Sequence, residues 1–230
     1  FPTKEKLDAL FPNRPVLLER VDGHASIANQ SALVAAGITK SFTLTGGDIV
    51  EKDGKLTGLL IDNAVALVAK KVPAPTEKQA RKLLLDAQQN CFAAGLTTID
   101  DCGLDFEAVE LVEKMHSDNS LKMRLYIMLS DAEKNYTYLF KRGAIKTDRL
   151  NVRSFKVYAD GALGSRGACL LHPYTDMPSK TGFLLSEIKH FEEVAKKINA
   201  RGFQMCTHAI GDSGNRTILK IYAAALKGKN

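Results

Sequence analysis

The chain has 230 residues, of which 45% are hydrophobic and 25% are charged, enough apolar material for one large domain or two small ones. Its formal net charge is +6, and no apolar run approaches the roughly 18 residues that a membrane-spanning helix needs. The basic residues are spread along predicted helices, as in Lys70-Lys71 and Lys196-Lys197, and are not interleaved with aromatic residues. The sequence therefore argues against nucleic-acid and membrane partners.

Four cysteines, at positions 91, 102, 169 and 206, show no CxxC spacing, which argues against a zinc knuckle or a disulfide framework. Free cysteines in or beside apolar stretches are common in reduced proteins, so the expected location is cytoplasmic. The chain starts at Phe1 without a signal-peptide pattern and stops directly after a helical pattern. We therefore expect a piece of a longer protein, from which an export signal could be missing.

The first third of the chain predicts short elements that are broken by proline and glycine. Thr3 is a candidate N-cap for a helix over 3–10, and Asp53-Gly54 sits between two alternating segments, as in a hairpin. The other elements expected in this third are a strand over 15–21, a helix over 26–36 and a helix over 62–71.

From residue 76 onward, predicted strands and helices alternate regularly. Thr76 is the expected N-cap of a long amphipathic helix, and Gly95 is its expected C-cap. The expected helices are 76–94, 106–116, one within 131–142, 186–200 and 212–226, and the expected strands are 96–101, 123–129, 152–160 and 203–207. A step of roughly 30 to 50 residues between strands is typical of βαβ units, so the pattern predicts an α/β fold with a parallel sheet.

Polar residues stand where these strands end: Asp100-Asp101, Ser130-Asp131, Asp160 and His208. The carboxyl ends of parallel strands carry the functional site in both barrels and doubly wound sheets. We therefore expect one polar face at this end of the sheet.

Lys156 lies within an otherwise apolar strand, where desolvation disfavours its charge. Alternation puts it on the same strand face as Tyr158 and Asp160, a set that suits a reaction centre better than a packed core. Three interpretations stay open: a lysine that reaches out to solvent, a lysine that captures carbon dioxide to become a metal-bridging anion, and a Schiff-base lysine.

His208 ends a strand three residues before Gly211, which allows close approach of another group. The alternatives are a core histidine satisfied by a neighbour and a functional ligand, and we favour the ligand because imidazole is a common metal ligand. His24, in Asp-Gly-His-Ala, ends an apolar strand in the same way, with a plain turn residue as its alternative.

The segment from Gly161 to Gly167 has the spacing GxxGxxG, which could cradle a phosphate but matches neither a P-loop nor a dinucleotide motif. A nucleotide-binding domain is therefore a further hypothesis. Arg166 in this segment could pair with a substrate carboxylate or clamp Asp160.

Five motifs occur in order along the chain: Arg14-Pro-Val, Asp22-Gly-His-Ala, Gly95-Leu-Thr-Thr-Ile-Asp100, Lys156-Val-Tyr-Ala-Asp-Gly-Ala-Leu-Gly-Ser-Arg166 and Thr207-His-Ala-Ile-Gly-Asp212. Together they resemble amidohydrolase family 3, and the likeness covers almost the whole chain. This is the branch of the metal-dependent amidohydrolase superfamily that includes N-substituted formamide deformylase. The motifs around Lys156 and His208 are the most specific.

The resemblance implies a partial TIM-like (β/α) barrel of the metal-dependent hydrolase type, with about strands 2–5 plus an inserted segment. Residues 1–75 would be the insertion between barrel strands 1 and 2, and residues 76–230 would be the βα units of strands 2 to 5. A partial barrel leaves open sheet edges, so we expect a homo-oligomer or strand exchange.

The resemblance also implies metal ligands at Lys156 and His208 for one or two divalent ions, with zinc as the expected metal. We assign substrate binding to His24, Asp160 and Arg166. The general acid/base aspartate is expected outside this chain, so no catalytic residue is assigned within it. No His-x-His pair occurs in the sequence, so we expect the isolated chain to hold metal incompletely, if at all, and to be inactive.

The function implied is hydrolysis, by a metal-activated water, of a carbon–nitrogen bond other than a peptide bond in a small amide-type substrate. The alternative is a non-catalytic α/β binding or scaffold domain with an incomplete metal site.

Overall fold

The computed structural model describes residues 1–228, and the chain divides into two compact units. Unit 1 consists of residues 1–73, 158–192 and 209–224, and unit 2 consists of residues 74–157, 193–208 and the residues from 225 onward. No helix within the described residues is long and apolar enough to cross a membrane. The assignment of residues 1–75 as an insertion between barrel strands stays a prediction.

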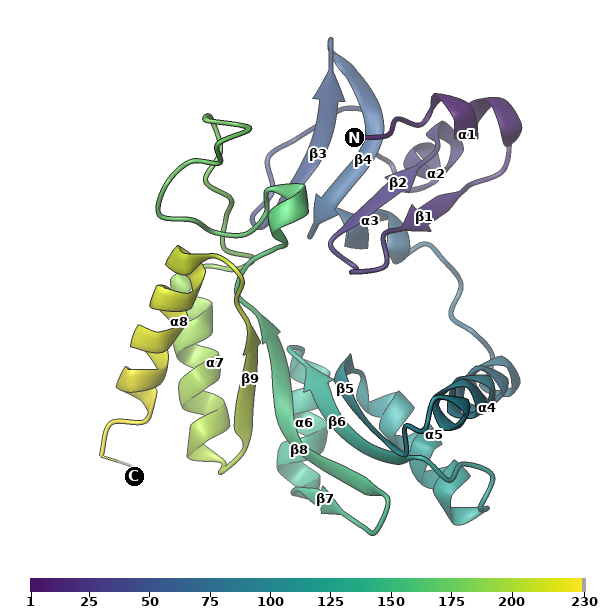
Figure 1. Cartoon of the computed structure of the whole chain (residues 1–230), viewed down its shortest axis with the longest axis vertical. Coiled ribbons are helices and arrows are strands. Elements are labelled where there is room, and N and C mark those ends of the chain that lie inside the picture. The colour runs from purple at the N-terminus through teal and green to yellow at the C-terminus, as the bar shows by residue number, and fades with distance from the viewer. Residues whose placement is uncertain (229–230) are drawn as a thin grey trace. The chain divides into compact units, whose positions relative to one another are not determined.

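Unit 1 is built on an antiparallel sheet with the strand order β1-β2-β4-β3, against which two short helices, α2 and α3, pack (Figure 1). Its elements are α1 (Glu5–Leu10), β1 (Leu17–Glu19), β2 (Ala25–Ala28), α2 (Gln30–Ala35), β3 (Gly47–Lys52), β4 (Lys55–Asp62) and α3 (Val65–Ala69). The core between sheet and helices contains Leu33, Leu60 and Ile49. The predicted hairpin at Asp53-Gly54 is confirmed, because β3 and β4 pair on either side of it.

The predicted helix over 26–36 is wrong in its first residues, which form β2 and pair with both β1 and β4. The helix starts only at Gln30, because Asn29 caps it: the side-chain oxygen of Asn29 accepts a hydrogen bond from Ala32 N at 3.0 Å. The predicted Thr3 cap is also wrong, since α1 begins after Lys4 and has no side-chain cap.

Unit 2 contains the parallel strands β5, β6 and β8, with β9 pairing with β8 and the short β7 antiparallel to the beginning of β8 (Figure 1). Helix α4 packs against α5, and α5 packs against α6. The elements that lie wholly in this unit are α4 (Glu77–Ala93), β5 (Thr98–Leu104), α5 (Phe106–Ser117), β6 (Arg124–Ser130), α6 (Glu133–Arg142), β7 (Ile145–Lys146) and β9 (Gln204–His208).

Three further elements cross the boundaries of the units: β8 (Leu150–Tyr158), α7 (Ile188–Ala200) and α8 (Asp212–Ala225). The predicted strand–helix alternation after residue 76 is thereby confirmed. Strand β7 and the short 3-10 helix η1 (Leu163–Ser165) are additional to it. The predicted cap is confirmed as well, because Thr76 and Gln79 form a reciprocal capping box at the start of α4.

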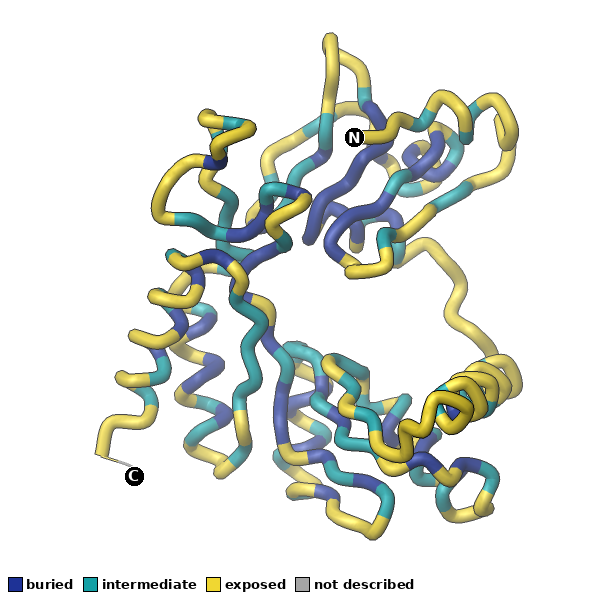
Figure 2. Tube along the Cα trace, viewed as in Figure 1, coloured by how far each residue is buried: buried dark blue, intermediate teal, exposed yellow. Residues whose placement is uncertain are grey.

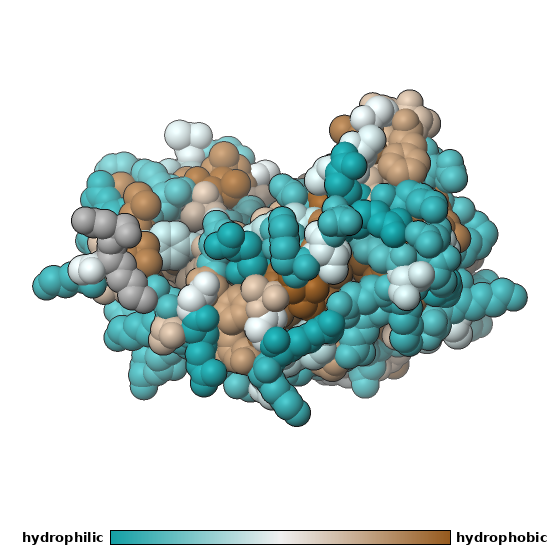
Figure 3. Space-filling model, turned by 90° about the horizontal axis from the view of Figure 1, so that it is seen from below, coloured by the Kyte–Doolittle hydropathy of each residue, from teal (hydrophilic) through white to brown (hydrophobic). Residues whose placement is uncertain are grey.

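Burial differs sharply between elements, as Figure 2 shows for the buried strands β2 and β4 and for the largely exposed α4. Within unit 2, Phe155 of β8 is fully buried in an aromatic cluster with Tyr136, Phe140 and Phe203. Hydrophilic side chains cover most of the face seen in Figure 3, with smaller hydrophobic patches between them. This distribution agrees with basic residues lying on solvated helix faces.

Candidate functional site

In unit 2, the ends of the parallel strands bring Lys156 and several polar side chains to one region. Ser130 of β6 lies opposite Lys156 of β8 in the register of the sheet. The strand β5 bulges at Gly103, where an added Cβ would lie 3.5 Å from Ser130 Oγ and 3.7 Å from Lys156 Cγ. Lys156 is half-buried, whereas its neighbours Phe155 and Val157 are buried on the opposite face. The strand therefore turns Lys156 away from the apolar core, as its alternation predicts.

Cys206 of β9 connects this region to His208. Burial raises the pKa of the Cys206 thiol, and the Ser154 hydroxyl and the Lys156 charge both act in the opposite direction. These influences place Cys206 in the neighbourhood of Lys156. His208 stands two residues further along the same strand, so its side chain leaves β9 on the same face as Cys206. The Nε2 nitrogen of His208 is buried.

The two predicted metal ligands therefore share one face of one sheet, and this donor set fits part of a metal site. Within residues 1–228, no group of three or more histidine, cysteine, aspartate and glutamate side chains is arranged to hold a metal ion. A catalytic zinc normally has three protein ligands, so Lys156 and His208 do not complete such a site by themselves.

Unit 2 also has an acid near the end of a strand. Asp101 is half-buried on β5, two residues before Gly103. Burial raises the pKa of its carboxyl group. Asp101 belongs to the polar strand ends that the sequence singles out, but no specific role was assigned to it.

In unit 1, His24 forms a buried pair with Asp62, a residue that the sequence analysis placed at the start of a helix. The Nδ1 atom of His24 lies 2.6 Å from Oδ1 of Asp62, and the two side chains are 11% and 1% exposed. Burial raises the pKa of Asp62, while the hydrogen bond from His24 acts against this increase. Asp62 ends the apolar strand β4, so the rule used for the other strand ends could have found it.

Asp160 is fully buried in unit 1, and its carboxylate accepts hydrogen bonds from three backbone amides. Oδ2 accepts from Cys169 N and Gly211 N, both at 2.8 Å, and Oδ1 accepts from Ile210 N at 2.9 Å. Asp160 thus ties the segment after β9 to the long loop that begins at residue 161. The prediction that it binds substrate stays a prediction, and the structure adds a structural role.

Arg166 pairs with Asp176 through Nη2 and Nε, at 2.7 and 3.3 Å, and its guanidinium lies over the ring of Phe1. The alternative of a clamp on Asp160 is therefore wrong, because a different carboxylate takes that place. Asp176 is exposed, so a substrate carboxylate could replace it beside Arg166. Substrate binding by Arg166 therefore also stays a prediction.

The glycine-rich turn does not have the surroundings of a phosphate cradle. Added Cβ atoms at Gly161 and Gly167 would lie 2.2 and 2.3 Å from Oδ2 of Asp62, so a buried carboxylate fills this place. A second anion at the same position would be repelled and desolvated. The geometry therefore disfavours the nucleotide-binding hypothesis.

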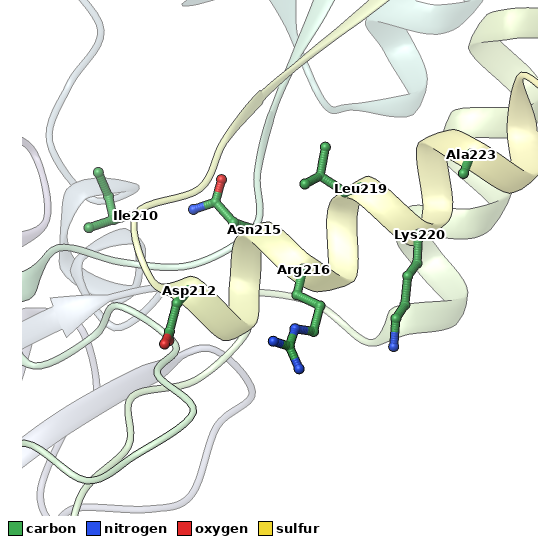
Figure 4. Close-up of a pocket in the computed structure, with 7 residues that line it drawn as sticks. All are labelled: Ile210, Asp212, Asn215, Arg216, Leu219, Lys220 and Ala223. Carbon is green, nitrogen blue, oxygen red and sulfur yellow. The ribbon is translucent and has the colours of Figure 1, made fainter.

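An open groove of about 720 Å³ runs along α8 in unit 1. Figure 4 shows its lining on one side of the helix and the loop before it: Ile210, Asp212, Asn215, Arg216, Leu219, Lys220 and Ala223. None of the five predicted site residues belongs to this lining.

The fold is α/β, and polar groups stand at the ends of its parallel strands. The model of the amidohydrolase family matches residues 1–230, so the chain belongs to that family.

Two curated relatives are more than 30% identical to this chain. YtcJ of Bacillus subtilis, whose name gives amidohydrolase as a provisional assignment, is 32% identical over 94% of this chain and 42% of its own length. Protein LONG AFTER FAR-RED 3 of Arabidopsis thaliana is 31% identical over 96% of this chain and 40% of its own length. The chain therefore spans less than half the length of these two relatives.

Two solved structures share the fold, and both are described as uncharacterized metal-dependent hydrolases. The one from Pyrococcus furiosus has a TM-score of 0.67 at 25% identity and matches 98% of this chain and 46% of its own. The one from Pyrococcus horikoshii has a TM-score of 0.69 at 21% identity and matches 97% of this chain and 44% of its own. The predicted α/β class is confirmed, and the fold corresponds to part of these larger structures.

Proposed function

We propose that this chain is part of a zinc-dependent amidohydrolase that hydrolyses a carbon–nitrogen bond, other than a peptide bond, in a small amide-type substrate. The observation that carries the proposal is the position of Lys156 and His208 on one face of the strand ends in unit 2. Family membership and the metal-dependent relatives support it. The (β/α) barrel is part of this proposal, with unit 2 providing the βα units that hold these two residues.

The proposal assigns a role to each of the five predicted site residues. Lys156 and His208 would hold one or two divalent ions together with ligands from outside the chain. A bound divalent ion would supply an activated water and polarise the substrate. His24 and Arg166 would bind substrate, and Asp160 would fix the loops around them. The cytoplasmic location is proposed from the four cysteines, which form no disulfide within the described residues.

A non-catalytic scaffold with an incomplete metal site is the second candidate. One observation favours it: within the described residues, fewer than three suitable donors come together. The two candidates differ in whether the protein expressed from its full open reading frame binds a stoichiometric metal.

The test is to replace Lys156 and His208 by alanine, one at a time, in that full-length protein. Each change should lower the bound metal and reduce turnover by about 100-fold or more, since even outer-shell changes commonly cost 10- to 100-fold. Elemental analysis and amide hydrolysis are the measurements. Lys146→Ala and His172→Ala, at two exposed positions, are the matched controls. Unchanged metal and turnover in both site variants would exclude the assignment.

A further inference from the structure

His24 and Asp62 are joined by one hydrogen bond between their side chains and one between their backbones. Besides the contact between Nδ1 and Oδ1, Asp62 N donates a hydrogen bond to His24 O at 3.0 Å. These two bonds lie where β2 begins and β4 ends, in a register fixed by three paired residues of each strand. The imidazole therefore has little freedom to rotate away from the carboxylate. Tyr158 packs edge-on against the ring, with 6.3 Å between centroids, which restricts it further.

Two glycines of the GxxGxxG turn, Gly161 and Gly167, leave the space that the Asp62 carboxylate occupies. Any Cβ at Gly161 or Gly167 would overlap Oδ2, and neither glycine has the left-handed backbone that would otherwise require glycine. Gly164, the middle glycine of the turn, has open space around it. The spacing that resembles a phosphate loop in the sequence is therefore explained by room for this carboxylate.

Asp62 is a costly residue for the interior. Its backbone has φ of +48°, and its buried Oδ2 has no hydrogen-bond partner among residues 1–228. An apolar residue would avoid both the desolvation of a carboxylate and the unsatisfied oxygen. What the carboxylate does supply is a fixed acceptor for one ring nitrogen of His24. The hydrogen bond at one imidazole nitrogen determines which nitrogen carries the proton.

We propose that Asp62 is a positioning residue that holds His24 in the Nδ1–H form, so that Nε2 is the acceptor for a substrate N–H or O–H group. The substrate contact rests on the proposed function, whereas the position of the proton does not. An amide-type substrate carries such a donor on its nitrogen. The ring retains 11% of its side-chain surface exposed, so part of it is accessible from solvent.

The experiment is nitrogen NMR of the histidine side chains in the labelled chain, with His24→Gln to identify the signal. The wild type should show the proton on Nδ1. In Asp62→Asn the amide can present its NH₂ group to the ring, as in serine protease variants with the same exchange, and the ratio of the two tautomers should reverse. Gly167→Ala should disturb the tautomer too, because it displaces the carboxylate.

Two variants serve as matched controls. Asp22→Asn removes another carboxylate beside His24, but Asp22 Oδ1 accepts from the backbone N of His24 at 3.2 Å and not from the ring. Gly164→Ala adds the same methyl group as Gly167→Ala at a position without neighbours. Both controls should keep the wild-type tautomer, and thermal unfolding shows whether each variant is folded.

Turnover in the protein expressed from its full open reading frame completes the test. Asp62→Asn should lower kcat/KM about tenfold, the effect of one hydrogen bond, and Asp22→Asn should leave it within about twofold. A wild-type proton on Nε2, a folded Asp62→Asn variant with the tautomer unchanged, or a reversed tautomer with unchanged kcat/KM would each overturn the proposal. Absence of any turnover in the wild type would instead overturn the proposed function, and the NMR result would still decide the position of the proton.

Discussion

At the scale of single residues, unit 1 contains two buried acids that the sequence cannot tell apart. Asp160 and Asp62 each follow an apolar strand, yet Asp160 accepts from three backbone amides and Asp62 pairs with one imidazole. The strand-end rule finds the positions, because it depends on local pattern. Apart from Cys169, the partners lie 38 to 51 residues away in the sequence, so the role of each acid depends on the tertiary structure.

The first prediction concerns Asp160. Asp160→Asn should destabilise the fold by about 1–3 kcal/mol, because the amide NH₂ group cannot accept from the buried backbone donors. Urea unfolding measures the loss. Asp212→Asn is the control: the exposed Asp212 accepts from Leu171 N and Ser213 N through Oδ1 alone, and the side-chain oxygen of asparagine can accept the same two hydrogen bonds. Equal losses in the two variants would contradict the structural role of Asp160.

At the scale of elements, the sequence predicts where α4 begins. It does not predict the side chain that attaches α4 to the rest of unit 2. The capping box of Thr76 and Gln79 defines its start locally. Gln88 is the one residue of α4 that is buried, and its Oε1 accepts from Lys122 N at 2.5 Å and Met123 N at 3.0 Å. A polar side chain thus holds α4 against the segment before β6.

Gln88→Ala should therefore destabilise unit 2 by about 1–3 kcal/mol, because two backbone donors lose their acceptor. Hydrogen exchange should become faster at the amides of Lys122 and Met123, and urea unfolding gives the overall loss. Gln89→Ala, at the exposed neighbouring position, should change neither measurement. Similar effects of the two substitutions would show that α4 is not anchored through Gln88.

A surface contact between α4 and the end of α5 gives a prediction with a pH dependence. Asp118 accepts hydrogen bonds from the backbone N of Ser120 at 2.9 Å and from Nη2 of Arg81 at 2.5 Å. The Ser120 side chain and these two donors lower the pKa of the Asp118 carboxyl group from 3.8 to about 2. Since the folded pKa lies below the unfolded value, this contact stabilises the fold above about pH 4 and is lost as the pH falls toward 2. Asp118→Asn should therefore reduce the urea midpoint at pH 7, and the difference from wild type should shrink between pH 4 and pH 2.5. A difference that does not change with pH would contradict this origin.

At the scale of the whole molecule, unit 2 has exposed sheet edges. Strands β5 and β9 are the outer strands of its parallel sheet within the described residues. Unpaired edges present rows of backbone donors and acceptors that can pair with another copy of the chain. The chain matches less than half the length of the curated relatives YtcJ and LONG AFTER FAR-RED 3, where further segments could cover such edges.

We therefore expect the isolated 230-residue chain to self-associate, as a homo-oligomer or by strand exchange. Light scattering at several concentrations, with and without reductant, is the measurement, because the chain has four cysteines. Association that disappears on reduction would point to disulfide exchange as its cause. A monodisperse monomer at all concentrations would contradict the prediction.

The sequence by itself determined the α/β class, the helix start at Thr76, the family and the positions of Lys156 and His208. These features depend on periodicity, capping and contiguous motifs, which involve residues close together in the chain. The tertiary structure decided that Ala25–Ala28 is a strand, that Asp62 orients His24, and that Gly161 and Gly167 make room for its carboxylate. The physical reason is that strand pairing and the burial of a charge depend on partners far away in the sequence, which local pattern does not specify.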